Sequence, residues 1–204
     1  MWLSFYNAQV GWDVLALTKG DISRDDLSTE SKGSVTRIFN TETNETVSFN
    51  VFGISEHFTP TGNGQVILTE EQEAAVNQVI KTAGFDDQIT VERSAKFVVG
   101  YVTECVPHED SDHLSVTQTE VDNGEVLQIV CGAANIRKGQ KVVVAKPGAV
   151  MNDGLIIWPG ELRGVKSNGM ICSAKELGVE NPTGKKGILV LDEQAETGKA
   201  FFDL

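Results

Sequence analysis

The first 90 residues alternate short apolar runs with polar turn clusters and then change to a helical pattern. Three runs are rich in Val, Ile, Phe and Thr with partial alternation, which is typical of β-strands, and they span residues 12–17, 34–39 and 46–54. Thr69 and Gln72 have the spacing of a capping box, apolar positions then recur on one helical face, and Gly84 can end the helix. We predict an α+β domain over residues 1–90, with the polar stretch 85–94 as a linker.

From Lys96 onward the pattern becomes all-β. Alternating runs predict strands at residues 96–105, 114–121, 126–131, 141–145 and 155–162. Asn123-Gly124 between two of these runs is a strong hairpin signal, because both residues tolerate positive φ. Ser173 and Glu176 fit a second capping box, which predicts a short helix ending at Gly178. Five short strands and one small helix have the size of an OB-fold barrel, which we place within residues 95–204.

The charge is unevenly distributed along this acidic chain, whose net charge is −12. Residues 1–95 carry 6 basic and 14 acidic side chains, and residues 96–128 carry 1 and 7. Residues 129–178 reverse the balance to +4, and the remainder returns to −2. Because phosphate binding depends largely on Lys and Arg, this single basic block is where a nucleic acid would bind.

Several functional classes lack support in the sequence. No run approaches the roughly 20 apolar residues of a membrane span, and the N-terminus does not have the pattern of a signal peptide. Three widely spaced cysteines suit reduced buried thiols, so we predict a cytoplasmic protein. His108, Asp110, Asp112 and His113 are grouped, but Asp side chains in turns usually bond backbone amides, so we predict neither metal nor cofactor.

Three stretches of the second half resemble a known family. They are CVPHEDSDHLSV at residues 105–116, LQIVCGAANIRKGQKV at 127–142 and LRGVKSNGMICSAKELG at 162–178. Together they are similar to the tRNA-binding domain at the start of the bacterial phenylalanyl-tRNA synthetase β chain. The resemblance continues through GILVL at 187–191, and the additional N-terminal domain makes the chain similar to YtpR-type stand-alone tRNA-binding proteins. His113 departs from the family pattern, which commonly has Lys or Arg there.

The resemblance implies a set of RNA-binding residues. It associates Asn135 with the RNA-binding face and places Ser167 and Met170 at motif positions implicated in RNA contact. The nearby cations that could contact phosphates are Lys141, Lys146, Arg163 and Lys166.

Each of these residues also has a purely structural interpretation. The Asn135 amide could fix its own loop, Met170 could belong to the core, and a single surface lysine is usually only a solvated charge. Trp158 is the best candidate for an exposed stacking residue, although a core position is the favoured interpretation for it. With few aromatic residues available, recognition is expected to rest on backbone charge and folded shape.

The resemblance implies tRNA binding without catalysis. Residues 178–186 have the wrong glycine spacing for a phosphate loop and no Ser or Thr after the lysine, so we interpret them as a surface loop. The alternative is a protein-interaction or dimerisation module that docks on a translation factor, with RNA binding weak or absent. The expected partners are therefore tRNA, a second copy of the chain, or a translation-associated protein.

Overall fold

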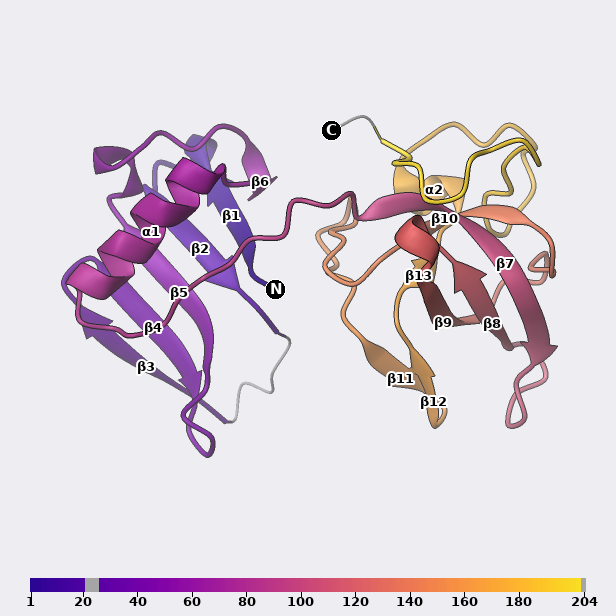
Figure 1. Ribbon diagram of the computed structural model, residues 1–204, viewed down its shortest axis with the longest axis horizontal. Helices are drawn as coiled ribbons and strands as arrows, with labels where there is room; N and C mark the ends of the chain where they lie inside the picture. The colour runs from indigo at the N-terminus through magenta and orange to yellow at the C-terminus, as the bar shows by residue number, and fades with distance from the viewer. Residues whose placement is uncertain (21–25, 203–204) are drawn as a thin grey trace. The chain divides into compact units, whose positions relative to one another are not determined.

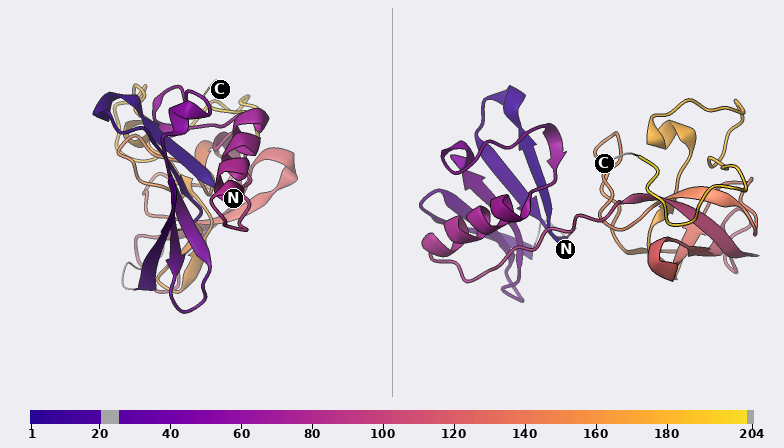
Figure 2. Two further views of the ribbon diagram at one scale, coloured as in Figure 1. Left: turned by 90° about the vertical axis from the view of Figure 1, so that its left-hand side faces the viewer. Right: turned by 45° about the horizontal axis from the view of Figure 1, so that its top comes forward.

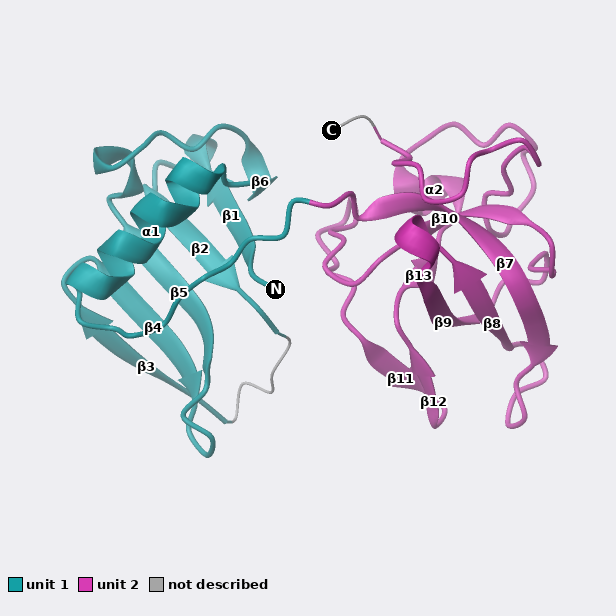
Figure 3. Cartoon of the chain, in the orientation of Figure 1, with its two compact units in different colours: residues 1–93 teal, residues 94–204 magenta. Residues whose placement is uncertain are grey.

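The chain is organised as two compact units. A computed structural model describes residues 1–20 and 26–202. Unit 1 is Met1–Arg93 and unit 2 is Ser94–Leu204, drawn in different colours in Figure 3. The predicted two-domain organisation, α+β followed by all-β, is confirmed. Within the described residues, no helix is both long enough and apolar enough to cross a membrane.

Unit 1 is built on a six-stranded antiparallel sheet with the strand order β3-β4-β5-β2-β1-β6. The strands are β1 (Leu3–Asn7), β2 (Val14–Thr18), β3 (Leu27–Lys32), β4 (Val35–Asn40), β5 (Thr46–Phe52) and β6 (Asn63–Val66). β2, β4 and β5 correspond to the three predicted strands. β3 and β6 are mostly polar, so they are strands because they pair with β4 and β1, and the sequence pattern did not predict them.

The helix α1 (Glu70–Thr82) covers one face of this sheet (Figures 1 and 2). Its predicted capping box is confirmed: the Thr69 hydroxyl accepts a hydrogen bond from the Gln72 amide at 3.2 Å, and the Gln72 side chain accepts one from the Thr69 amide at 3.0 Å. Val76 and Ile80 point to the sheet and pack with Phe49 and its neighbours in one buried cluster. Burial of each such side chain contributes about 1.5–3 kcal/mol, so the core fixes the helix on this face.

The segment after α1 belongs to unit 1, and the predicted linker at residues 85–94 was wrong. Phe85, Ile89 and Val91 are buried in the core under the helix. The Asn77 side chain holds both backbone groups of Ile89, at 2.8 and 3.0 Å. The polar residues between these apolar anchors face outward, which is why the stretch has the composition of a linker.

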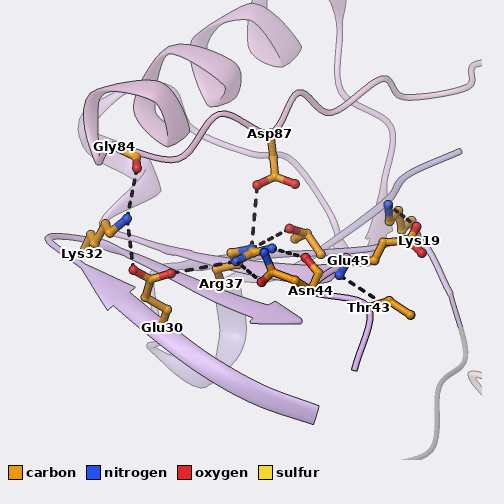
Figure 4. A network of polar contacts seen from close by, with 10 residues as sticks. Lys19, Glu30, Lys32, Arg37, Thr43, Asn44, Glu45, Gly84 and Asp87 are labelled. Carbon is orange, nitrogen blue, oxygen red and sulfur yellow. Dashed lines mark hydrogen bonds and ion pairs between the residues drawn. The ribbon is translucent and has the colours of Figure 1, made fainter. Parts of the chain in front are cut away.

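A network of charged side chains lies on the face of β3 and β4 that is turned toward α1 (Figure 4). Lys32 donates to the Gly84 carbonyl at 3.1 Å and pairs with Glu30 at the same distance. Arg37 donates to the Asn44 carbonyl at 2.6 Å, and its guanidinium lies 3.8 Å from Asp87. These contacts tie the end of the helix and the following segment to the sheet.

Unit 2 is a nearly closed antiparallel barrel with the strand order β13-β10-β7-β8-β9. The strands are β7 (Phe97–Pro107), β8 (Ser115–Glu120), β9 (Val126–Cys131), β10 (Lys141–Ala145) and β13 (Met170–Ile171). The segment before β13 lies along β9, where the Asn168 amide donates to the Gln128 carbonyl at 2.8 Å. The predicted five-stranded OB-fold barrel with a short helix is therefore confirmed.

The barrel has an inner core and a second apolar layer outside β10. Val142 and Val144 point into the barrel, whereas Val143 and Ala145 point outward against α2 (Ala174–Leu177) and the segments around it. Burial on both faces explains the uninterrupted apolar run of this strand. The predicted caps of α2 are confirmed, with Ser173 and Glu176 in a capping box and Gly178 in the left-handed region at φ 67°.

The fifth predicted strand, residues 155–162, was wrong. Only Gly160–Leu162 is a strand, β11, and it pairs with β12 (Val165–Ser167) in a two-stranded hairpin beside the barrel. The barrel's fifth strand is the two-residue β13, which is too short to show a periodic pattern. The hairpin predicted at Asn123-Gly124 is confirmed, since both residues have positive φ, 57° and 72°.

Gly100 lies where the barrel wall leaves no room for a side chain, which gives a first testable prediction. A Cβ atom there would lie 2.5 Å from Val144 Cγ2 and 2.9 Å from Thr119 Cγ2, and both side chains are fully buried. We expect Gly100→Ala to destabilise unit 2 by about 1–3 kcal/mol, because the packed neighbours must shift. Hydrogen exchange of unit 2 peptides in a urea series measures this destabilisation.

The control is Gly160→Ala, where the new Cβ would lie 3.9 Å from its nearest neighbour, the Trp158 carbonyl oxygen. Its effect should stay within about 0.5 kcal/mol. Equal stability of the two variants would show that the side chains around Gly100 can move to accept a methyl group at little cost in free energy.

Candidate nucleic-acid interface

The β11–β12 hairpin carries two of the predicted phosphate contacts. Arg163 and Gly164 form its turn with φ of 48° and 79°, and this turn places the Arg163 side chain at the exposed tip. The guanidinium donates to the Asp110 carbonyl at 2.8 Å, which fixes the tip against the loop after β7. Lys166 is exposed on β12, while its carbonyl accepts a hydrogen bond from Gln128. Both cations are thus held on a rigid backbone and remain open to solvent.

Ser167 lies at the base of the same hairpin. Its hydroxyl oxygen accepts a hydrogen bond from the Val130 amide at 3.1 Å and donates one to the Gly169 carbonyl at 3.3 Å. The side chain therefore joins the hairpin to β9. Met170 follows in β13, half-buried against the outer apolar layer.

Asn135 binds the backbone of a distant segment. Its amide nitrogen donates to the Ile188 carbonyl at 3.0 Å, and its amide oxygen accepts from the Ile188 amide at 3.0 Å. Gly187 lies directly against this amide, since a Cβ there would be 2.1 Å from Asn135 Oδ1. Asn135 thus clamps the end of the loop formed by residues 181–187 to the loop after β9.

This clamp creates a pocket with two lysines that the sequence motifs did not single out. Asn135, Asn181, Thr183, Lys185 and Lys186 line a pocket of about 160 Å³. Both lysines are exposed, and Asn181 shapes their loop by donating to the Lys185 carbonyl at 2.8 Å. The signal in the sequence is the Gly184-Lys185-Lys186 run, which falls in the stretch interpreted above as a surface loop.

The two remaining predicted phosphate contacts are engaged within the protein. Lys141 is half-buried, hydrogen-bonded to the Thr197 hydroxyl and 4.8 Å from the centre of the Tyr101 ring. Lys146 is only 7% exposed, and its ammonium pairs with both oxygens of Asp122 at 2.8 and 2.9 Å. Lys146 is therefore largely buried, with its charge paired to a carboxylate of the same unit.

The loop between β7 and β8 supports the hairpin and holds the grouped histidines. His108 is buried, with Nδ1 accepting from the Asp110 amide at 3.0 Å and Nε2 lying 3.3 Å from the Leu162 carbonyl. His113 is exposed, and its hydrogen bond lowers the pKa of the Asp112 carboxyl. Among residues 1–20 and 26–202, no three His, Cys, Asp or Glu side chains gather as a metal site.

The buried cysteines are poor nucleophiles. Burial raises the pKa of the Cys172 thiol to about 12 and raises that of Cys131 as well. A thiol must ionise to react, so burial makes both cysteines less reactive than an exposed thiol.

Comparison with known proteins agrees with this arrangement. Residues 97–200 match the family described as "Putative tRNA binding domain", and residues 22–92 match a family described as a domain of unknown function. The chain is 48% identical over 198 residues to the "Putative tRNA-binding protein YtpR" of Bacillus subtilis, covering 97% of this chain and 98% of that protein. It is 55% identical over 113 residues to the phenylalanine–tRNA ligase β subunit of Oceanobacillus iheyensis, covering 52% of this chain but only 14% of the subunit.

The fold and these matches define the class: a two-domain protein whose second half is an OB-fold module of the tRNA-binding-domain type. The match to the Bacillus subtilis protein extends over both units and nearly the full length of each chain. The chain belongs to the YtpR family.

Proposed function

We propose that this protein is a cytoplasmic, non-catalytic tRNA-binding protein associated with translation, and that it holds tRNA by backbone charge and shape through unit 2. The family relationship supports tRNA as the ligand, since both the stand-alone relative and the synthetase subunits carry tRNA in their names. The observation that carries the proposal for this chain is the exposed pair Lys185 and Lys186 around the Asn135 pocket.

The interface in this proposal has two cationic parts. One is the lysine pair held by Asn135, and the other is the hairpin with Arg163 and Lys166. Ser167 and Met170 border the second part at the base of the hairpin and on β13. Lys141 is retained only as a weaker candidate, because its ammonium already has Thr197 and Tyr101 as partners. Lys146 is left out.

The partial burial of most aromatic side chains in unit 2 supports recognition of tRNA by its shape over recognition by base stacking. Trp158 is half-buried, Tyr101 lies beneath Lys141, and Phe97 packs against Phe202. Among the described aromatic side chains of unit 2 only Phe202 is classed as exposed, at 38%, and it packs edge-on against Phe97 and Phe201. Binding should therefore depend on phosphate contacts and be strongly weakened by salt.

The test is a titration of the purified chain with mixed tRNA at a series of salt concentrations. We expect a complex at low salt whose log affinity falls linearly with log salt concentration. Lys185→Gln and Lys186→Gln should each reduce that slope by about one unit, because each removes the charge that binds one phosphate. Lys81→Gln on α1 is the matched control, because it removes one exposed lysine from unit 1.

The outcomes distinguish the proposal from its alternative. No complex even at the lowest salt would reject tRNA binding, and an unchanged slope would remove that lysine from the interface. Duplex DNA as a competitor checks for general attraction to polyanions, since it should displace tRNA poorly if folded shape is recognised.

The second candidate function is association with a second copy or with a translation-associated protein. One observation favours it: unit 1 exposes a sheet face on which no strand of the described residues places a charge. This surface belongs to unit 1, whereas the proposed RNA-binding cations belong to unit 2, so the two functions would use different residues.

A further inference from the structure

The charged residues of the unit 1 strands all lie on one face of the sheet. Across β1 to β6 the only charged residues are Glu30, Lys32 and Arg37. Register places them beside the buried positions Val35 and Phe49, on the side covered by α1, where they form the network in Figure 4. The opposite face therefore receives no charged side chain from any strand.

That opposite face is at least partly exposed on all six strands, although Leu3 on β1 is buried within it. No α-helix in the described part of unit 1 covers it (Figure 2). One row of paired residues crosses all six strands and consists of Gln65, Phe5, Ala16, Asn50, Thr36 and Ser31. The row mixes apolar groups with amides and hydroxyls that both donate and accept. Such a surface can form hydrogen bonds with an identical surface.

One end of this face carries both a projecting aromatic side chain and a groove. Trp12 is 76% exposed on the turn before β2, and Phe52 beside it is 47% exposed. They line an apolar groove of about 380 Å³ together with Phe5, Val14 and Ala16. Exposed aromatic residues around an uncharged apolar groove are typical of protein interfaces.

We propose that this face is the interface of a two-fold dimer, in which Trp12 of each copy enters the groove of the other. A two-fold interface brings the same patch of both subunits together, so it must contain both a projection and its receptor, as this face does. The distribution of charge also favours a second copy of the chain as the partner. The chain has a net charge of −12, so two copies repel on most faces, whereas this one brings no strand charges together. A nucleic acid would need cations here, and a basic protein would prefer the acidic surfaces.

The size of the face determines the expected strength. Six strands at about 4.8 Å spacing span about 24 Å, and strands of about six residues are about 20 Å long. Two copies would then bury about 1,000 Å² of projected surface, which is in the range of small, reversible interfaces. The dimer should therefore dissociate on dilution, with a dissociation constant in the micromolar range.

Sedimentation velocity of the full chain over a range of concentrations, without RNA, tests this proposal. We expect a monomer–dimer equilibrium that does not weaken as salt screens the net charge. Trp12→Ala should raise the dissociation constant about 30-fold or more, the effect of removing a central aromatic anchor. Asn50→Asp should weaken the dimer as well, because symmetry brings two new carboxylates onto the same uncharged face.

The matched control is Gln78→Glu, which makes the same amide-to-acid change on the exposed side of α1 and should leave the dimer intact. Circular dichroism checks that each variant is folded, and Trp12 is exposed enough that its replacement should not unfold unit 1. A wild-type chain that stays monomeric up to about 1 mM would overturn the proposal. So would a dimer that neither Trp12→Ala nor Asn50→Asp weakens, since its interface would lie elsewhere.

Discussion

Replacement of Asp122 by alanine is expected to destabilise unit 2 by about 3 kcal/mol, at the low end of the range for buried ion pairs because Asp122 is partly exposed. The reason is the ammonium of Lys146, which is 7% exposed and has both Asp122 oxygens within 2.9 Å. Without the carboxylate a positive charge stays buried with no counter-ion, and the folded state must either carry that charge or open to solvate it.

Hydrogen exchange in a urea series measures this effect, because peptides from β8 and β10 report on unit 2 alone and the two units need not unfold together. Glu125→Ala is the control. It removes an exposed acid from the same hairpin and should change stability by less than about 0.5 kcal/mol. Lys146→Met should cost less than Asp122→Ala, since an apolar chain of similar length leaves no buried charge. A similar small destabilisation in Asp122→Ala and Glu125→Ala would show that water reaches the ammonium.

The same variants separate the structural role of Lys146 from an RNA-binding one. The salt dependence of tRNA binding should be the same for Lys146→Met as for the wild type. A decrease of about one unit in the slope would return Lys146 to the interface.

Local signals in the sequence were sufficient for the elements whose hydrogen bonds are local. The capping boxes at Thr69 and Ser173 and the turn at Asn123-Gly124 each depend on residues within three positions, and all three formed as predicted. β3 and β6 depend instead on partners that the sequence does not mark. The stretch after α1 was misassigned for a related reason: its three apolar anchors become informative only once the helix lies over them.

The candidate site also depends on contacts between distant residues, which the sequence does not reveal. The family motifs pointed to Asn135, Ser167 and Met170, and the structure shows what each one contacts. Whether a lysine is free could not be read from the motifs, because the partner of Lys146 is 24 residues away and the clamp on Asn135 spans 53. Spacing places residues along a chain, whereas the availability of a cation depends on contacts across the fold.

In these proposals the two units have different functions, RNA binding in unit 2 and dimerisation in unit 1. The cations proposed for RNA binding lie on the hairpin and the clamped loop of unit 2, while the acidic unit 1 has one sheet face without strand charges. A dimer formed through unit 1 would carry two tRNA-binding modules. Its avidity for RNA would depend on whether both can bind one molecule at once.

Asn135→Ala is expected to lower both the stability of unit 2 and its affinity for tRNA. The alanine leaves the amide and carbonyl of the buried Ile188 without partners, which should cost about 2–6 kcal/mol at about 1–3 per unsatisfied group. Exchange should accelerate at residues 185–190, and Lys185 and Lys186 should no longer have a fixed position. The slope of log affinity against log salt should change little, because no charge is removed at Asn135.

A double-mutant cycle decides whether Asn135 acts through the lysines or touches RNA itself. If it positions them, the affinity decreases of Asn135→Ala and of the double variant Lys185→Gln/Lys186→Gln will be less than additive, since removing the charges leaves little to position. Asn181→Ala is the comparison: it frees the same loop locally, through its bond to the Lys185 carbonyl, but keeps the Ile188 anchor. Additive decreases, with unchanged exchange around Ile188, would contradict the clamp and make Asn135 a direct RNA contact.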